Sequence, residues 1–140
     1  LSNLGADIIT VHAGGGIEMM RAAKRSAGRA KVIAVTVLTS QKLSARKKVL
    51  DLTRDAIAAG VDGIVCSGLE VRAVSKLTRG GKILRIVPGV RPTSYAKTDD
   101  QTRVVTPQIA IKNGATHIVI GRPVTQSKDP LAALSSLLRP

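Results

Sequence analysis

A glycine and an arginine near the end of the chain have the types and spacing expected of a phosphate site. The apolar run 118–120 leads directly into Gly121 and Arg122. A glycine at the end of a buried strand lets the backbone come close to a ligand. The planar, permanently charged guanidinium of arginine suits bidentate contact with phosphate. A strand-ending turn that carries a surface arginine explains the same pattern without a ligand.

Arg91 is a second cation that is expected at the same edge of a sheet. It follows the apolar run 83–87 and the pair Pro88-Gly89. In (β/α) barrels, the loops after the last two strands commonly form a phosphate site. The polar segment from Arg91 to about residue 105 is long for a connector, and such loops are often functional. Gln101 within it has an amide that can donate to a ligand, although a merely solvated loop fits equally well.

Hydroxyl and imidazole groups follow two other predicted strands. Thr39 and Ser40 suit the polar edge of a ring such as a base, or they cap the next helix. His12 precedes the glycines 14–16, with no second histidine or carboxylate at metal-ligand spacing. His117 lies at the opposite end of its strand, so we expect structural roles for both histidines.

The carboxylates do not form an acid/base centre in this sequence. Asp7 and Asp62 stand at the beginnings of predicted strands, which is the wrong end for barrel chemistry. Asp51 and Asp55 are four residues apart on a predicted helix and are expected at its surface. The chain therefore offers binding groups for a phosphate and a polar ring, with no catalytic residue and no metal site.

β-Branched runs alternate with helix-period runs along the chain, which predicts βα units on a parallel sheet. Strands are expected at 7–13, 31–38, 61–67, 83–87 and 116–120. Helices are expected up to about 27, at 44–59 and 70–76, from Thr106-Pro107 to 113, and after a cap at Ser127 or Asp129. Polar or glycine residues end every strand. This favours a partial (β/α)8 barrel of about five units over an open doubly wound sheet.

Composition and charge narrow the function classes. Ala, Val, Ile and Leu dominate the apolar residues. Tyr95 is the single tyrosine, and the sequence has no Phe or Trp. The net charge of +13 is spread over the polar sides of three helical segments, at 21–29, 46–48 and 72–79. Without aromatic residues for base stacking, this distribution indicates a solvated outer face and disfavours nucleic acid as a partner.

Single-cysteine usage and hydropathy indicate a cytoplasmic protein. Cys66 lies in the apolar run 64–67, so a buried structural thiol is expected and no disulfide can form within the chain. No apolar run approaches the ~18 residues of a membrane span. The opening from Leu1 does not have the pattern of a cleavable signal sequence.

Five motifs together resemble bacterial orotidine 5′-phosphate decarboxylase. They are Val11-His-Ala-Gly-Gly15, Ala34-Val-Thr-Val-Leu-Thr-Ser40, Asp62-Gly-Ile-Val-Cys-Ser67, Pro88-Gly-Val-Arg-Pro92 and Ile120-Gly-Arg-Pro-Val-Thr-Gln-Ser127. Their order and spacing correspond to the fourth to eighth strands of that family's barrel. The resemblance covers essentially the whole chain, as one domain over residues 1–140 that lacks the three N-terminal βα units.

The resemblance implies a cofactor-free, metal-free lyase of pyrimidine biosynthesis that converts orotidine 5′-monophosphate (OMP) to uridine 5′-monophosphate (UMP). It implies a homodimer with active sites near the subunit interface. Phosphate would be held by Arg91, Gln101, Gly121 and Arg122. Thr39 and its neighbour Ser40 would contact the pyrimidine.

The family's catalytic Asp-x-Lys-x-x-Asp motif does not occur in the 140 residues. Its lysine would protonate the product carbon and its aspartates would set the surrounding electrostatics. We therefore expect the isolated chain to be inactive, with activity restored by an N-terminal portion. Alternatives are an inactive remnant that binds nucleotide or phosphate or serves in assembly, and a basic nucleic-acid binder. Two unpaired sheet edges would favour an oligomer or a complex.

Overall fold

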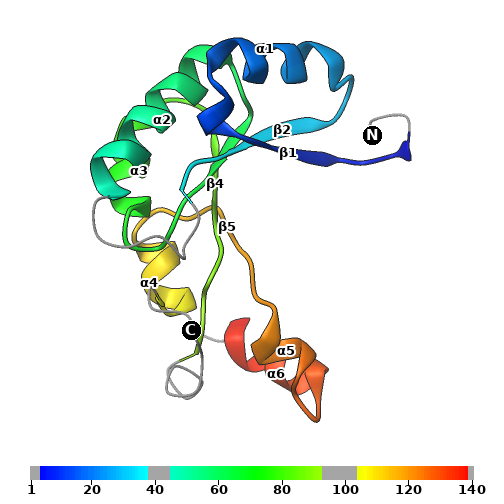
Figure 1. The fold of residues 1–140 in the computed structure, drawn as a ribbon. Coiled ribbons are helices and arrows are strands. Elements are labelled where there is room, and N and C mark those ends of the chain that lie inside the picture. The colour runs from blue at the N-terminus through cyan, green and yellow to red at the C-terminus, as the bar shows by residue number, and fades with distance from the viewer. Residues whose placement is uncertain (1–3, 38–44, 93–103, 139–140) are drawn as a thin grey trace.

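A computed structural model describes residues 4–37, 45–92 and 104–138 of the chain. One sheet has the strand order β1-β2-β3-β4-β5, with all neighbouring strands parallel (Figure 1). The strands are β1 (Ile8–His12), β2 (Lys31–Val35), β3 (Gly63–Val65), β4 (Leu84–Val87) and β5 (His117–Ile118). The strand order follows the chain order, as expected of consecutive βα units in a barrel wall.

The helices are α1 (Ile17–Ser26), α2 (Ala45–Ala59), α3 (Val71–Leu77), α4 (Pro107–Lys112), α5 (Arg122–Thr125) and α6 (Pro130–Leu138), with a 3-10 turn η2 (Ala13–Gly15). The prediction of five βα units in a partial barrel is confirmed, since the described strands are parallel, follow one another in chain order and do not close into a full barrel. Two expectations about boundaries are wrong. The strands are shorter than the apolar runs, and the short helix α5, which begins at Arg122, was not among the expected helices.

Helices α1, α2 and α3 cover one face of the sheet, which we call the helix-covered face (Figure 1). Val32, Ala34 and Ile64 point to it and are fully buried in the core. Ile9 and Val11 on β1, Val87 on β4 and Ile118 on β5 pack in the same core. The apolar character of β2 therefore reflects real burial in the middle of the sheet.

The alternate residues of the same strands point to the opposite face, which we call the open face. Cross-strand pairing places His12, Val35, Val65, Ile86 and His117 in one row on it. Both histidines are exposed, and the three aliphatic residues between them are half-buried. No described helix lies over this row, so only its centre is shielded, by the strands themselves.

Local caps explain where the later helices begin and end. The Thr106 hydroxyl accepts a hydrogen bond from the Ile109 amide at 3.3 Å, as the Thr-Pro pair predicted. At α6 the structure decides between two expected caps, because the Asp129 carboxylate accepts from the Ala132 amide at 2.9 Å. Gly60, with φ of +77°, ends α2 in a conformation that glycine adopts without strain.

Candidate phosphate site at the ends of β4 and β5

Arg91 is held in place by backbone pairing just beyond β4. Its amide donates to the Val105 carbonyl at 3.0 Å, within an isolated parallel bridge between Val90 and Val105. One guanidinium nitrogen, Nη1, donates to the Val90 carbonyl at 3.0 Å. The side chain is only 5% exposed. A buried arginine anchored at both its backbone and its guanidinium presents a fixed positive charge at this edge of the sheet.

Gly121 and Arg122 lie at the start of α5, just beyond β5. The Gly121 carbonyl accepts hydrogen bonds from the Val124 and Thr125 amides at 2.9 and 3.1 Å. A Cβ atom added to Gly121 would meet nothing within 4 Å, so the space beside this residue is open. Arg122 is half-buried, and Pro123 behind it is buried. The backbone at Gly121 can therefore be approached closely, as a phosphate oxygen would require.

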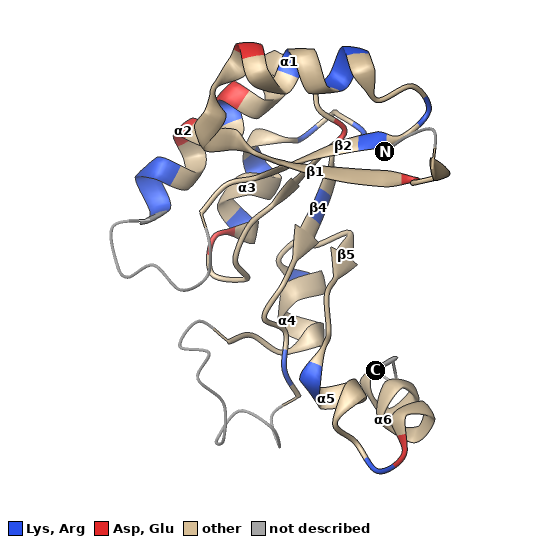
Figure 2. Ribbon diagram, turned by 45° about the vertical axis from the view of Figure 1, so that its right-hand side comes forward, with Lys and Arg blue, Asp and Glu red and all other residues tan. Residues whose placement is uncertain are grey.

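The sheet register brings the two arginines to equivalent positions. Val87 pairs with Ile118, and Arg91 and Arg122 each follow their member of that pair by four residues (87 to 91, 118 to 122). The Val119 amide extends the pairing by donating to the Val87 carbonyl at 2.9 Å. The segment after β4 and the start of α5 lie close together at one end of the sheet (Figures 1 and 2). Two guanidinium groups that follow neighbouring strands at the same end of the sheet suit a dianionic phosphate.

Three of the predicted site residues lie outside the described residues, namely Thr39, Ser40 and Gln101. Their contacts to a pyrimidine and a phosphate therefore stay predictions. Ser67, at the end of β3, is 1% exposed and its hydroxyl accepts from the Leu69 amide at 3.2 Å. It caps the turn before α3, so this strand end serves the fold.

The two histidines, His12 and His117, lie in the same row of the sheet although they stand at opposite ends of their strands. His12 ends β1 and His117 begins β5, yet both belong to the single row on the open face. Successive barrel strands are staggered, so opposite ends of distant strands can share one level. Three strands still separate the rings. Nδ1 of His117 lies 3.0 Å from the Thr116 hydroxyl, in keeping with a structural role.

The carboxylates of the described residues serve the fold. Asp62 binds the Lys24 ammonium through both oxygens, at 2.7 and 2.6 Å, and also accepts from the Val32 amide at 2.7 Å. Asp51 pairs with Lys47 and Arg54 at the surface of α2. Within the described ranges no group of three or more His, Cys, Asp or Glu side chains is placed to hold a metal ion.

A buried polar group beneath α3 was missed by the sequence analysis. Glu70 is 4% exposed, and Arg85 donates from Nε to the Gly114 carbonyl at 2.5 Å and from Nη1 to the Ile83 carbonyl at 3.1 Å. Cys66 lies close to both. Burial, together with the nearby Glu70 carboxylate, raises the pKa of its thiol to about 12, and the Arg85 guanidinium opposes this shift. The prediction of a buried cysteine is confirmed.

The family model described as orotidine 5′-phosphate decarboxylase / HUMPS family matches residues 1–137. The chain belongs to this family. It is 42% identical to orotidine 5′-phosphate decarboxylase of Streptococcus pneumoniae (strain Hungary19A-6), in an alignment of 149 positions that covers 98% of the chain and 63% of that enzyme. The chain thus spans less than two thirds of the length of this relative.

Solved structures with the same fold include an orotidine 5′-phosphate decarboxylase and an uncharacterized protein. The enzyme from Lactobacillus acidophilus matches with a TM-score of 0.78 and 34% identity, over 97% of this chain and 63% of that one. An uncharacterized conserved protein from Geobacillus kaustophilus matches with a TM-score of 0.75 and 32% identity, over 97% and 64%. The chain's five βα units therefore correspond to part of a decarboxylase barrel.

In the part of the chain that the structure describes, no helix is long and apolar enough to cross a membrane.

Proposed function

We propose that this chain carries the phosphate- and pyrimidine-binding half of an orotidine 5′-phosphate decarboxylase site. Arg91, Gly121 and Arg122 bind the 5′-phosphate of OMP or UMP, and Gln101 adds an amide hydrogen bond. Thr39 and Ser40 contact the pyrimidine. The equal spacing of the two arginines beyond the Val87–Ile118 pair supports the proposal, because two guanidinium groups near the ends of neighbouring strands suit one anion.

Catalysis in this proposal depends on residues that the 140-residue sequence does not contain. Binding and positioning alone leave the proton transfer and the electrostatic stabilisation of the transition state unsupplied. An N-terminal portion with three βα units would add them, and its outer strands would pair with the free edges of β1 and β5. The isolated chain is inactive, as a monomer or a homo-oligomer, and its pyrimidine-nucleotide affinity is retained.

The test mixes the chain with the N-terminal third of the Streptococcus pneumoniae relative and follows OMP decarboxylation by absorbance. Decarboxylation is expected from the mixture and from neither part alone. Arg122→Ala should lower kcat/KM for the mixture at least about a hundredfold, since a charge-assisted contact to the substrate's phosphate is lost. No turnover across a wide concentration range would exclude complementation.

The second candidate function is an inactive nucleotide-binding or assembly protein, which is compatible with the missing catalytic motif. It predicts UMP binding without turnover in any mixture. Calorimetry with UMP, comparing the parent chain with Arg122→Ala, separates it from a chain that binds nothing. Equal UMP affinity for both would reject the phosphate site at α5 under either function.

A further inference from the structure

A second concentration of positive charge lies on the helix-covered side of the molecule, away from Arg91 and Arg122. A pocket of about 300 Å³ opens between α2 and α3, and the described residues that line it are Arg46, Leu69, Arg72, Ala73 and Lys76. Three of these five side chains are cationic. Figure 2 shows basic segments at the start of α2 and on α3, which were expected as separate solvated faces and which the fold brings together.

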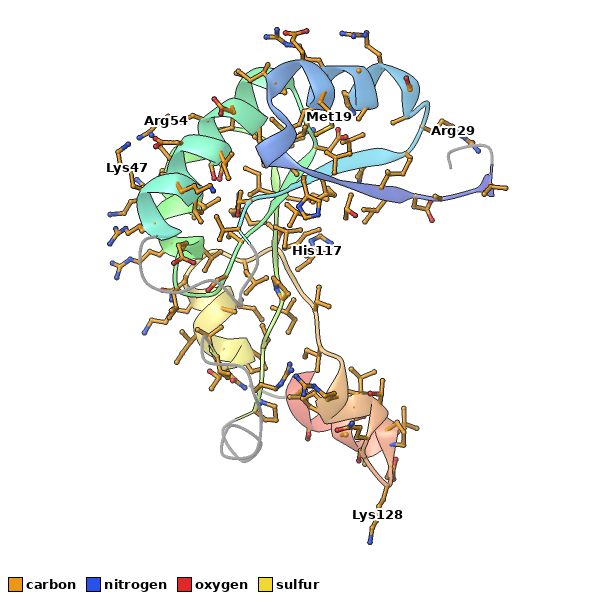
Figure 3. All side chains as sticks on the ribbon, in the orientation of Figure 1. Met19, Arg29, Lys47, Arg54, His117 and Lys128 are labelled. Carbon is orange, nitrogen blue, oxygen red and sulfur yellow. The ribbon has the colours of Figure 1, made fainter. Side chains whose placement is uncertain are left out.

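No carboxylate lines the pocket among the described residues. Glu70, the nearest acid along α3, is 4% exposed and lies close enough to the buried Cys66 to affect its pKa. Asp51 on α2 is engaged by Lys47 at 3.2 Å and Arg54 at 2.7 Å. In Figure 3 the labelled Lys47 and Arg54 side chains extend from α2 away from the sheet. The sequence of residues 38–44, just before α2, contains no acid either.

The lining combines three cationic side chains with two apolar ones. Arg46, Arg72 and Lys76 are exposed, and Leu69 keeps 59% of its surface exposed beside the half-buried Ala73. Two guanidinium groups and one ammonium around a concave surface match the oxygens of a phosphoryl group, which arginine binds in bidentate geometry. The volume is at the lower end of small-ligand sites. A compact anion fits these dimensions better than a long polymer.

We propose that this pocket is a second anion site, distinct from the candidate substrate site, that binds a compact phosphorylated or polyphosphate group. Arg72 and Lys76, on successive turns of α3, bind the anion from one side of the pocket, and Arg46 on α2 binds it from the other. The pocket stands on its own residues, so it does not depend on the proposed decarboxylase function.

Calorimetry with inorganic pyrophosphate tests the site in an Arg122→Ala background, which removes binding at the candidate substrate site. Pyrophosphate should bind with a Kd below about 1 mM. Adding Arg72→Ala and Lys76→Ala should raise the Kd at least about tenfold, because two charge-assisted contacts are lost. The matched control, Arg25→Ala with Arg29→Ala, removes the same charge from an exposed part of α1 and its following turn and should change the Kd less than about twofold.

Several outcomes would overturn the proposal. If no binding is detected at pyrophosphate concentrations up to several times the expected Kd, the site is rejected. An equal loss in the control pair shows that binding follows net charge alone. A duplex RNA probe that binds through Arg72 and Lys76, while pyrophosphate does not, assigns the surface to nucleic acid. UMP binding to the parent chain, measured separately, reports on the substrate site, so failure of one proposal is distinguishable from failure of the other.

Discussion

On the helix-covered face of the sheet Ile64 is fully buried, whereas on the open face Ile8 is 45% exposed and Val119 is 49% exposed. The two faces are built from alternate residues of the same strands, so composition alone does not cause the difference. The covering layer differs, and so does the place in the sheet, because Ile33 on the open face of the inner strand β2 is fully buried beside Gly63. Helices α1 to α3 pack on one face, and no described element packs on the row from His12 to His117.

The contrast shows that this sheet is made for two covered faces. Parallel sheets are normally buried on both sides, because their strands carry apolar residues on each. The open face has half-buried Val35, Val65 and Ile86, together with exposed aliphatic residues at both edges. Covering them would remove further apolar surface from water, at about 25 cal/mol per Å². A partner that completes the barrel wall would gain that stabilisation, in agreement with the proposed complementation.

The largest predicted effect compares the same substitution on the two faces. Ile64→Ala should lower the free energy of unfolding by about 2–5 kcal/mol, because it opens a cavity in a fully buried core. Ile8→Ala, on the open face, should cost less than about 1 kcal/mol, since water already reaches that side chain. Urea denaturation followed by circular dichroism measures both. Similar losses at the two positions would show that the open face is covered in solution.

A second prediction concerns pH and the buried thiol on the helix-covered face. Burial raises the pKa of Cys66 from 9.0 to about 12, so the folded state keeps its proton where the unfolded state has lost it. Stability from this group is complete below pH 9 and is lost as the pH rises toward 12. Relative to Cys66→Ala, the parent chain should lose about 1 kcal/mol more per pH unit in that window.

Urea titrations of both proteins at pH 8, 9.5 and 10.5 measure this difference in slope. Parallel curves would mean that the thiol ionises in the folded state near its ordinary pKa. Labelling with a thiol reagent at pH 8 gives an independent check. It should be slow in the folded chain and fast in urea, because the thiolate is the reactive form.

A third prediction addresses how α1 is held on the covered face. Asp62→Ala removes the partner of Lys24 and of the Val32 amide together, and should cost about 1–2 kcal/mol, discounted because the ion pair is partly exposed. Asp51→Ala is the matched control. Its two ion-pair partners are exposed on α2, so the loss should stay below about 1 kcal/mol. Thermal or urea unfolding measures both losses of stability. Equal losses would show that the hydrogen bond from the Val32 amide to Asp62 adds no measurable stability.

Strong local signals made most of the fold predictable. The Thr106-Pro107 pair predicted the start of α4, and the apolar run 31–38 predicted β2 as a buried strand. The thiol of Cys66 was also expected to be buried. Each of these follows from propensity, capping or periodicity within a few residues. The phosphate role of the Gly121-Arg122 pair stays a prediction, which rests on residue types that suit phosphate.

Features that depend on long-range packing could not be predicted from the sequence. The buried Glu70 and the half-buried Arg85 carry no local signal that separates them from surface charges. The shared row of His12 and His117 depends on the stagger of five strands. The pocket between α2 and α3 exists because two basic segments, far apart in sequence, meet in the fold. Tertiary geometry determines all three.

The smallest predicted effect on stability tests the open face as a contact surface. Val119→Lys places a charge on a residue that is 49% exposed, so the free energy of unfolding should change by less than about 0.5 kcal/mol. Self-association should nevertheless weaken, because a charge on an unpartnered sheet face opposes pairing with another chain. Sedimentation velocity over a range of concentrations measures this. The control Leu69→Lys adds the same charge at an exposed apolar residue beyond the open face and should leave association unchanged. If both variants dissociate equally, net charge governs assembly and the open face is not its contact surface.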